Sequence, residues 1–375
     1  MNRIPPFDLS EQYKLIGAEM NAAALEVLAS GRYIGGSWVA DFESQFAEYI
    51  GTSECIACNS GTDALYLALR ALGIGSGDEV ITTPFTFVAT AEVISAVGAT
   101  PVFVDIDLAT FNLNLDQVEA AITGHTRAVI PVHLFGLPVN MTRLMAIAQT
   151  HNLLIVEDCA QSTGAEWEGQ KVGSIGHIGC FSFYPTKNLG ACGDGGAITT
   201  NDPALAERLR RLRDHGRQGA YYYEELGVNS RLDAVQAAIL QIKLRHLDQW
   251  NQQRRDVADR YQHLLSPIPN ITRPQEMAGG KSVWNQYTIR VTGERDAGTA
   301  RDRVRSQLQE RGVASMVYYP LPLHLQPAYR DLGYQIGQLP LAEQASQQVL
   351  SLPMFPEITL EQQEQVAYSL KDCLA

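Results

Sequence analysis

The sequence predicts an α/β fold in which a mostly parallel sheet lies between two layers of helices. Short apolar runs alternate with segments of helical periodicity over much of the 375 residues. Polar residues that suggest chemistry follow directly after such runs, where the carboxyl ends of parallel strands bind ligands. A chain of this length also exceeds the usual size of one hydrophobic core. We therefore expect a large domain over residues 1–245 and a smaller α+β domain over 246–375.

Two helices are predicted to precede the sheet. Apolar residues recur at helical spacing over residues 8–30, and Gly31 is a suitable C-cap. Residues 32–37 read as a loop, and residues 38–50 have a second amphipathic pattern.

The alternation that follows predicts seven strands with helices in most of the intervals between them. The strands are expected at 55–58, 79–82, 101–105, 127–131, 153–157, 178–183 and 197–200. The helices are expected at 62–72, 86–97, 115–122, 141–151 and 203–214.

The C-terminal part has a different pattern. A long helical periodicity covers residues 232–265, and the domain boundary is expected inside it. Beyond it we expect strands at 286–291 and 314–318 and helices at 299–311 and 341–349.

Charge and composition exclude several classes of protein. The net charge of −12 argues against nucleic acid as the main partner, and the arginines between Arg208 and Arg217 are expected on a solvated helix surface. The N-terminus lacks the apolar core of a signal peptide, and no apolar stretch approaches the length of a membrane span. Six cysteines without repeated spacing fit a reducing compartment. We expect a cytoplasmic protein that has no membrane partner.

Cys55 and Cys58 form the one CxxC pair of the sequence. On a strand, side chains three positions apart point to opposite faces, so these thiols are poorly placed to share a metal ion. We interpret them as buried structural cysteines, and no metal site is predicted.

Lys187 is the most informative residue for predicting the chemistry of this protein. It lies between an apolar run and a glycine-rich turn, while Asp158 ends the earlier run at 153–157 and Gln161 follows three positions later. Pyridoxal phosphate (PLP) needs an amine to hold its aldehyde as an imine and an acid to keep its ring nitrogen protonated. Taken singly, Lys187 could be a surface lysine, Asp158 a helix N-cap and Gln161 a surface glutamine. Together they predict a PLP site.

The turn from Ser60 into the helix at 62–72 could bind a phosphate. Its backbone N–H groups and the positive helix end suit an anion, although ordinary capping explains the same residues and Asp63 would have to face away. Ser182, five residues before Lys187, is a second candidate phosphate ligand. Phe87 could stack on a pyridine ring or belong to the core, and His133 is assigned no role.

With these residues assembled, the chain resembles the DegT–StrS family of sugar aminotransferases, which are PLP enzymes of fold type I. The resemblance covers nearly the whole chain. It is carried by the stretches at 31–35, 60–65, 157–162, 182–189, 227–233 and 319–322. It implies that Lys187 forms the imine and shuttles protons, that Asp158 contacts the ring nitrogen, and that Gln161 contacts the phenolic oxygen.

The resemblance assigns further residues. It implies that Gly61, Thr62 and Ser182 hold the phosphate and that Phe87 stacks on the ring. Asn229 matches an asparagine that reaches the phosphate of the neighbouring subunit, which implies a homodimer with shared active sites. Relatives that remove a sugar hydroxyl carry histidine where this chain has Lys187, so a transaminase is expected instead of a dehydratase.

The resemblance also implies a substrate class. We expect L-glutamate to leave its amine on the cofactor as pyridoxamine phosphate and depart as 2-oxoglutarate, after which a nucleotide-linked keto sugar receives the amine. A dTDP-linked 3-keto-6-deoxyhexose aminated at C3 is favoured. A UDP-linked 3-keto-uronic acid is the alternative, and a non-catalytic PLP-sensing or sugar-sensing regulatory protein is the alternative of another class.

Three residues are expected to contact the substrate. They are Tyr33, Arg231 and Tyr318. Arg231 suits either a uronate carboxylate or a nucleotide phosphate. Tyr318 stands where many relatives have the histidine of a His-Tyr-Pro sequence, so a sugar contact made by that histidine is not expected in this chain.

Overall fold

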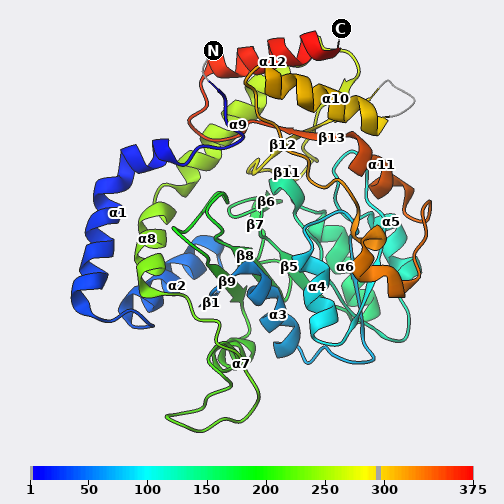
Figure 1. Ribbon diagram of the computed structural model, residues 1–375. Coiled ribbons are helices and arrows are strands. Elements are labelled where there is room, and N and C mark those ends of the chain that lie inside the picture. The colour runs from blue at the N-terminus through cyan, green and yellow to red at the C-terminus, as the bar shows by residue number, and fades with distance from the viewer. Residues whose placement is uncertain (1–2, 293–296, 375) are drawn as a thin grey trace.

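A seven-stranded sheet forms the centre of the computed structural model, which describes residues 3–292 and 297–374 (Figure 1). Its strands are β1 (Glu54–Cys58), β2 (Glu79–Thr82), β3 (Thr100–Phe103), β4 (Thr126–Val129), β5 (Leu154–Asp158), β8 (Ile178–Ser182) and β9 (Gly196–Thr200). They lie in the order β1-β9-β8-β5-β4-β2-β3. β9 is antiparallel to both of its neighbours, and the remaining pairs are parallel. The predicted α/β class and all seven predicted strands are confirmed.

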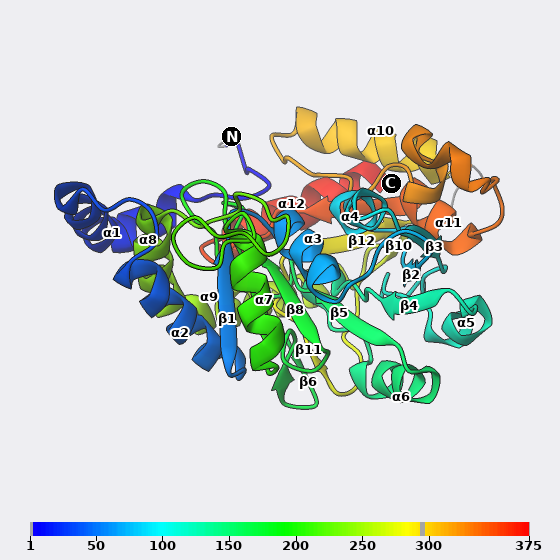
Figure 2. The same cartoon turned by 90° about the horizontal axis from the view of Figure 1, so that it is seen from below.

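Helices cover both faces of this sheet (Figure 2). One face packs against α3 (Gly61–Ala71), α4 (Ala89–Ala96) and α7 (Pro203–Arg213). The opposite face packs against α2 (Ser37–Ile50), α5 (Leu115–Val118), α6 (Met141–His151) and α8 (Ala234–Leu244). Cys55 and Cys58 are free, buried thiols that belong to the cores on opposite faces, as their spacing on a strand predicted.

The long helix predicted over 232–265 is two helices. α8 ends at Leu244, and α9 (Leu247–Leu264) begins after a two-residue turn. The N–H groups of Arg245 and His246 donate to carbonyls three residues earlier, and this tightening ends the α-helical bonding. The predicted domain boundary after residue 245 falls in this turn and stays a prediction.

α1 (Ser10–Ser30) packs against α8 and ends at Gly31, whose φ of 68° gives the predicted left-handed C-cap. A small separate sheet has β6 (Glu166–Trp167) at its centre, antiparallel to β7 (Gln170–Lys171) on one side and to β11 (Gly280–Lys281) on the other.

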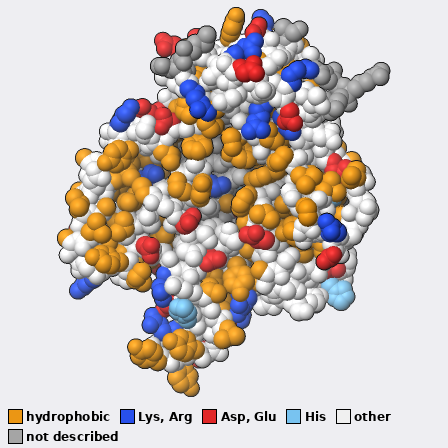
Figure 3. All heavy atoms as spheres, in the orientation of Figure 1, with side chains coloured by type: hydrophobic (Ala, Val, Ile, Leu, Met, Phe, Trp, Pro, Cys, Tyr) orange, Lys and Arg blue, Asp and Glu red, His pale blue; other side chains and the backbone are white. Residues whose placement is uncertain are grey.

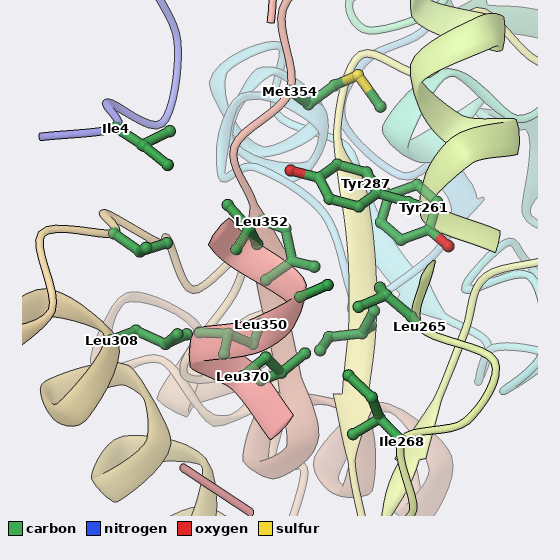
Figure 4. Close-up of a cluster of buried hydrophobic side chains, with 14 of the residues drawn as sticks. Ile4, Tyr261, Leu265, Ile268, Tyr287, Leu308, Leu350, Leu352, Met354 and Leu370 are labelled. Carbon is green, nitrogen blue, oxygen red and sulfur yellow. The ribbon is translucent and has the colours of Figure 1, made fainter. Parts of the chain in front are cut away.

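The C-terminal part has its own core around a three-stranded antiparallel sheet (Figure 4). The strands are β10 (Ile271–Thr272), β12 (Tyr287–Val291) and β13 (Val349–Leu352), and the accompanying helices are α10 (Ala297–Glu310), α11 (Pro340–Gln348) and α12 (Leu360–Leu374). The strand predicted at 314–318 is wrong. Met316 exchanges two backbone hydrogen bonds with Ser351 and no ladder continues from them, because the chain there turns toward Tyr318 and the large sheet.

The segment before α1 completes this C-terminal core. The Ile4 N–H donates to the Gly312 carbonyl at 2.8 Å, and the Ala314 N–H donates to the Ile4 carbonyl at 3.0 Å. The Ile4 side chain points into the same apolar cluster as Leu308 and Leu352 (Figure 4). Residues from the two ends of the sequence therefore share one core.

The arginines of α7 and the following turn are engaged by acidic side chains. The ion pairs are Arg208 with Glu225, Arg210 with Glu54, Arg211 with Glu207, Arg213 with Glu43 and Arg217 with Asp214. The cluster is thus a set of ion pairs at the protein surface. Within residues 3–292 and 297–374, none of the helices combines the length and the apolar character needed to cross a bilayer.

Truncation of Leu350 should destabilise the C-terminal core. This β13 side chain is fully buried, so Leu350→Ala should lower the free energy of unfolding by about 2–5 kcal/mol through lost burial and a cavity. The matched variant Leu360→Ala removes the same atoms from a half-exposed site and should cost less than about 1 kcal/mol. Urea unfolding followed by circular dichroism measures both values, and equal losses would contradict this assignment of the core.

Candidate active site

The candidate site lies where the carboxyl ends of four strands meet. β1, β2, β5 and β8 run in the same direction. Gly61 follows β1 and Phe87 follows β2, while Asp158 and Ser182 are the last residues of β5 and β8. Figure 3 views the molecule from the side to which these strand ends point and shows a hollow near the centre of that face, with apolar side chains on its rim. The topology therefore gathers residues that are far apart in the sequence.

Asp158 is a buried acid at the end of β5. Its Oδ2 accepts a hydrogen bond from Thr90 Oγ1 at 2.8 Å, and its Oδ1 accepts one from the Ala160 N–H at 3.1 Å. Burial raises the pKa of Asp158 above its usual value, while these two donors and the nearby Lys187 oppose the rise. A carboxylate has more acceptor positions than these two bonds use, so it can still accept a hydrogen bond from a ligand cation.

Lys187 supplies an amine beside this acid. Its backbone N–H donates to the Tyr184 carbonyl at 2.9 Å, which forms the turn after β8. Burial lowers the pKa of Lys187 to about 8, and the charge of Asp158 opposes that change. A substantial neutral fraction near neutral pH is the form that reacts with an aldehyde.

A chain of buried amides holds the loop that carries Lys187. Asn188 Nδ2 donates to the Val283 carbonyl at 2.9 Å and to Asn251 Oδ1 at 2.7 Å. Because the carbonyl fixes Nδ2 as the donor, Asn188 Oδ1 is left to accept from Asn285 Nδ2, also at 2.7 Å. The loop is thereby tied to α9 and to the segment before β12. The position of Asn188 directly after Lys187 was the available signal for this role, which was not predicted from the sequence.

Close glycine contacts shape the same loop. A Cβ built on Gly61 would lie 2.7 Å from Ser182 Cβ, so the α3 turn and the end of β8 can approach only with glycine there. A Cβ on Gly190 would lie 2.3 Å from the Pro185 carbonyl oxygen. These glycines let protein segments pack against each other, in addition to any approach to a ligand.

The N-terminus of α3 can hold an anion. Ser60 Oγ caps the helix by accepting from the Asp63 N–H at 3.1 Å. In the part of the chain that the structure describes, the N–H groups of Gly61 and Thr62 have no protein acceptor. Gly61 lies close to the side chain of Ser182, so the structure brings together the two predicted phosphate-binding positions, the α3 N-terminus and Ser182.

Gln161 is oriented by two contacts. Its Oε1 accepts from the Phe135 N–H at 2.7 Å, which leaves Nε2 to donate, here to the Tyr319 hydroxyl at 3.2 Å. The amide therefore presents a donor toward the residues around Asp158. Tyr319, the neighbour of the predicted Tyr318, was not singled out from the sequence.

The cluster of His133, Glu157 and Cys159 is the one group of metal-type donors found among the described residues. Glu157 accepts from His133 Nε2 at 3.0 Å and from the N–H groups of Gly173, Ile175 and Gly176, while His133 Nδ1 accepts from the Val139 N–H. Burial raises the pKa of Cys159 well above its usual value, so it stays a thiol. The ring nitrogens of His133 and the carboxylate oxygens of Glu157 are already used in these bonds, so the pair braces the end of β5, which is a role for His133 that the sequence did not reveal.

A second group of predicted residues lies beside the phosphate turn. Arg231 Nη1 contacts Asp214 Oδ1 at 2.5 Å, and Asn229 forms a backbone bridge with Asp214. Burial opposes a low pKa for Asp214, but its hydrogen bonds with Arg231 and Arg217 lower that pKa overall. The Tyr33 carbonyl accepts from the Ala234 N–H at 2.9 Å, so Tyr33 lies next to this group.

The remaining predicted residues lie on the rim of the site. Phe87, just before α4, has 57% of its surface exposed, so within one chain it is not a core aromatic. Tyr318 is half-buried near Tyr184 and lines a small cavity with Thr186.

Residues 14–371 match the family described as the DegT/DnrJ/EryC1/StrS aminotransferase family. This chain belongs to that family. It is a PLP-dependent aminotransferase, and the predicted family, fold type and cofactor are confirmed. An amine beside a buried acid, with a helix N-terminus nearby, is a donor set that fits this cofactor.

Individual relatives agree over almost the whole length. A protein of Geobacillus stearothermophilus called "Pleiotropic regulatory protein" is 49% identical over 98% of each chain. A Streptomyces venezuelae protein, "dTDP-3-amino-3,4,6-trideoxy-alpha-D-glucose transaminase", is 45% identical over 99% of this chain and 96% of its own. The crystal structure of S. venezuelae DesV in complex with a ketimine intermediate aligns with a TM-score of 0.95 and 45% identity over 99% of this chain and 98% of its own.

The environment of Lys187 predicts how cofactor capture depends on pH. Capture of added PLP by the apoenzyme should accelerate as the pH rises through about 8, because only the neutral amine attacks the aldehyde. Asp158→Asn should move this midpoint to lower pH, since the carboxylate charge favours the ammonium form. Stopped-flow absorbance measures the rates, and Lys281→Ala at an exposed lysine is the control. A midpoint near 10.5, the ordinary value for lysine, would contradict the desolvated environment.

Proposed function

We propose that this enzyme transfers the amino group of L-glutamate to C3 of a dTDP-linked 3-keto-6-deoxyhexose. The observation that carries the chemistry is the desolvated amine of Lys187 beside the buried carboxylate of Asp158 at the carboxyl edge of the sheet. The substrate class is supported by the 45% identical S. venezuelae relative, whose name is that of a dTDP-amino-sugar transaminase. Glutamate as the donor follows from the family resemblance.

Lys187 is the proposed catalytic base and cofactor-bearing residue. When bound, PLP supplies an electron sink that lets the amino group pass first from donor to cofactor and then to the keto sugar. Because burial keeps the pKa of Lys187 near 8, its amine can take up and release a proton under mild conditions. Two successive half-reactions at one site predict ping-pong kinetics.

Asp158 and Gln161 are proposed to orient and polarise the ring. An ionised Asp158 would form a charge-assisted hydrogen bond with the ring nitrogen. The Nε2 of Gln161, fixed as a donor by the Phe135 N–H, would donate to the phenolic oxygen. Both side chains are almost fully buried, so water competes weakly for these bonds.

Other residues at the carboxyl edge of the sheet are proposed to bind the cofactor phosphate and to stack on the pyridine ring. Gly61 and Thr62 would donate backbone N–H groups, and Ser182 would add its hydroxyl. The exposed ring of Phe87 would stack on the pyridine, which explains why a large aromatic side chain is left open on the rim.

We propose a homodimer in which Asn229 reaches the phosphate of the partner's site. Asn229 is exposed at the base of a loop that projects from the molecule after α7 (Figure 1). That loop carries Tyr221, Tyr222 and Leu226, each more than 70% exposed, and such apolar surface favours contact with another chain.

Tyr33, Arg231 and Tyr318 are the proposed substrate contacts. The guanidinium of Arg231 already pairs with Asp214, so a uronate carboxylate would have to compete with an existing ion pair. A nucleotide phosphate would meet the same competition, so the preference for a 6-deoxyhexose rests on the name of the S. venezuelae relative, and the UDP-linked 3-keto-uronic acid remains the alternative. The regulatory alternative is favoured by the names of two relatives, "Pleiotropic regulatory protein" and "Erythromycin biosynthesis sensory transduction protein EryC1". The amine and the acid needed for turnover are nevertheless both present in this chain.

The domain division after residue 245 and a cytoplasmic location complete the proposal. Two of the cores support the division, since one is built from residues 56–212 and the other from residues 257–373 together with Ile4. Six free cysteines support a reducing compartment.

Lys187→Ala should abolish both the visible band of the bound cofactor and turnover, because it removes the amine beside Asp158 that is proposed to hold the aldehyde. Purified enzyme charged with glutamate should convert the dTDP-3-keto-6-deoxyhexose with a higher kcat/KM than the UDP-3-keto-uronic acid. Lys281→Ala should keep both properties. Retention of the band by Lys187→Ala would refute the lysine assignment, whereas a preference for the uronate would refute the substrate assignment alone.

Co-expression of two inactive chains should restore activity if Asn229 acts across the dimer. A Lys187→Ala chain paired with an Asn229→Ala chain rebuilds one complete site per heterodimer. The matched pair of Lys187→Ala with Asp158→Asn rebuilds none, because both residues serve their own chain. Purified heterodimers assayed for transamination should show recovery for the first pair only. Equal activity of both pairs would place Asn229 outside the partner's site.

A further inference from the structure

The carboxylate of Asp158 depends on one side chain from another element. Among the described residues its hydrogen-bond donors are the Ala160 N–H, which belongs to its own turn, and the Thr90 hydroxyl of α4, 2.8 Å from Oδ2. The Ala160 N–H is only two residues from Asp158, so this bond does not fix the carboxylate relative to other elements. The Thr90 bond connects β5 with a helix 68 positions earlier in the sequence, so it is the contact that fixes the carboxylate relative to the rest of the site.

The direction of this bond follows from the chemistry of its partners. An ionised carboxylate only accepts, so the single hydroxyl hydrogen of Thr90 points to Asp158. Thr90 Oγ1 also lies 3.0 Å from Thr86 Oγ1, and with its own hydrogen committed it must accept there. The result is a one-way chain from Thr86 through Thr90 to Asp158. Both threonines are buried, with at most 3% of their surface exposed, so water cannot replace either bond.

The position of Thr90 in α4 adds to this effect. Thr86 and Thr90 are four positions apart and share one side of the turn that opens the helix, while Phe87 on the same turn is exposed. The carboxylate therefore lies at the N-terminal end of α4, where the helix dipole favours a negative charge. One turn of chain thus carries the proposed stacking ring and the donor to the proposed acid.

We propose that Thr90 is a positioning residue for the cofactor, which holds Asp158 in the orientation and charge state needed to bind the ring nitrogen. This inference rests on the proposed role of Asp158. Burial alone would favour the neutral acid, and the Thr90 bond is the largest influence that opposes it. Thr90 itself does not need to touch the cofactor.

The test compares two ligands that differ only at the ring nitrogen. Apoenzyme is titrated with PLP and with its 1-deaza analogue, in which a C–H group replaces that nitrogen. Both ligands offer Lys187 the same aldehyde and offer the phosphate turn the same anion, so those contributions cancel. Thr90→Val keeps the shape of the side chain and removes the hydroxyl. It should weaken PLP binding about tenfold or more, as expected for a lost hydrogen bond to a charged group, and change the Kd of the analogue less than about threefold.

Three further variants make the outcome decisive. Thr90→Ser retains the hydroxyl and should restore PLP binding to within about threefold of the parent, allowing for small shifts of the hydroxyl. Thr288→Val removes an equally buried hydroxyl that contacts Ser351 in the C-terminal sheet, and it should affect neither ligand. Asp158→Asn should lose the preference for PLP over the analogue.

The results separate the inference from the proposal on which it rests. Equal weakening of both ligands by Thr90→Val would show a structural role only and overturn the inference. If Asp158→Asn loses the preference for PLP while Thr90→Val keeps it, the inference fails and the role of Asp158 stands. If Asp158→Asn keeps the preference, the proposed role of Asp158 fails as well.

Discussion

The burial of Asp158 is the constraint on which the rest of the site depends. A carboxylate removed from water tends to take up a proton, and this acid is almost fully enclosed. The surroundings oppose that tendency with the Thr90 hydroxyl, the Ala160 N–H, the start of α4 and the amine of Lys187. The same enclosure lowers the pKa of Lys187. The same burial thus favours the neutral form of both groups, and the hydrogen bonds to Asp158 oppose its protonation.

The supports around this space come from both faces of the large sheet. Successive residues of a strand point to opposite faces, so Asp158 lies on the side of α4 while Glu157 lies on the other side. There Glu157 gathers three backbone N–H groups and His133. The backbone N–H of His133 in turn donates to the backbone carbonyl of Asp158 at 3.1 Å. The buried pair of His133 and Glu157 therefore helps to fix the end of β5.

Much of the large sheet could be predicted from the sequence because each buried strand is a short apolar run. Asp158 and Lys187 could be predicted for the same reason, since each is a charged residue that follows such an apolar run. Two strands of the small sheet, β10 and β13, were missed. β10 has only two residues, and β13 directly continues α11, where a short apolar run cannot be told from a helix end by periodicity. The turn between α8 and α9 was hidden because apolar residues recur on both sides of it.

Other parts of the site could not be derived from one sequence. Thr90 looks like any helix residue until β5 is placed beside α4, and the bonds of Asn188 reach Asn251 and Asn285 far along the chain. Such polar contacts depend on tertiary distance, and neither spacing nor composition encodes them. By contrast, the opposite orientation of Cys55 and Cys58 needs only the geometry of a strand.

The packing of Ile4 has a consequence for the order in which the molecule can fold. During synthesis Ile4 leaves the ribosome before its neighbours Leu308, Gly312 and Leu352, which lie more than 300 positions later in the sequence. The segment before α1 must stay undocked until residue 352 has left the ribosome, and contacts of such sequence separation form slowly. A protein fused ahead of Ile4 would be anchored to the C-terminal core and not to the sheet that follows it in the sequence.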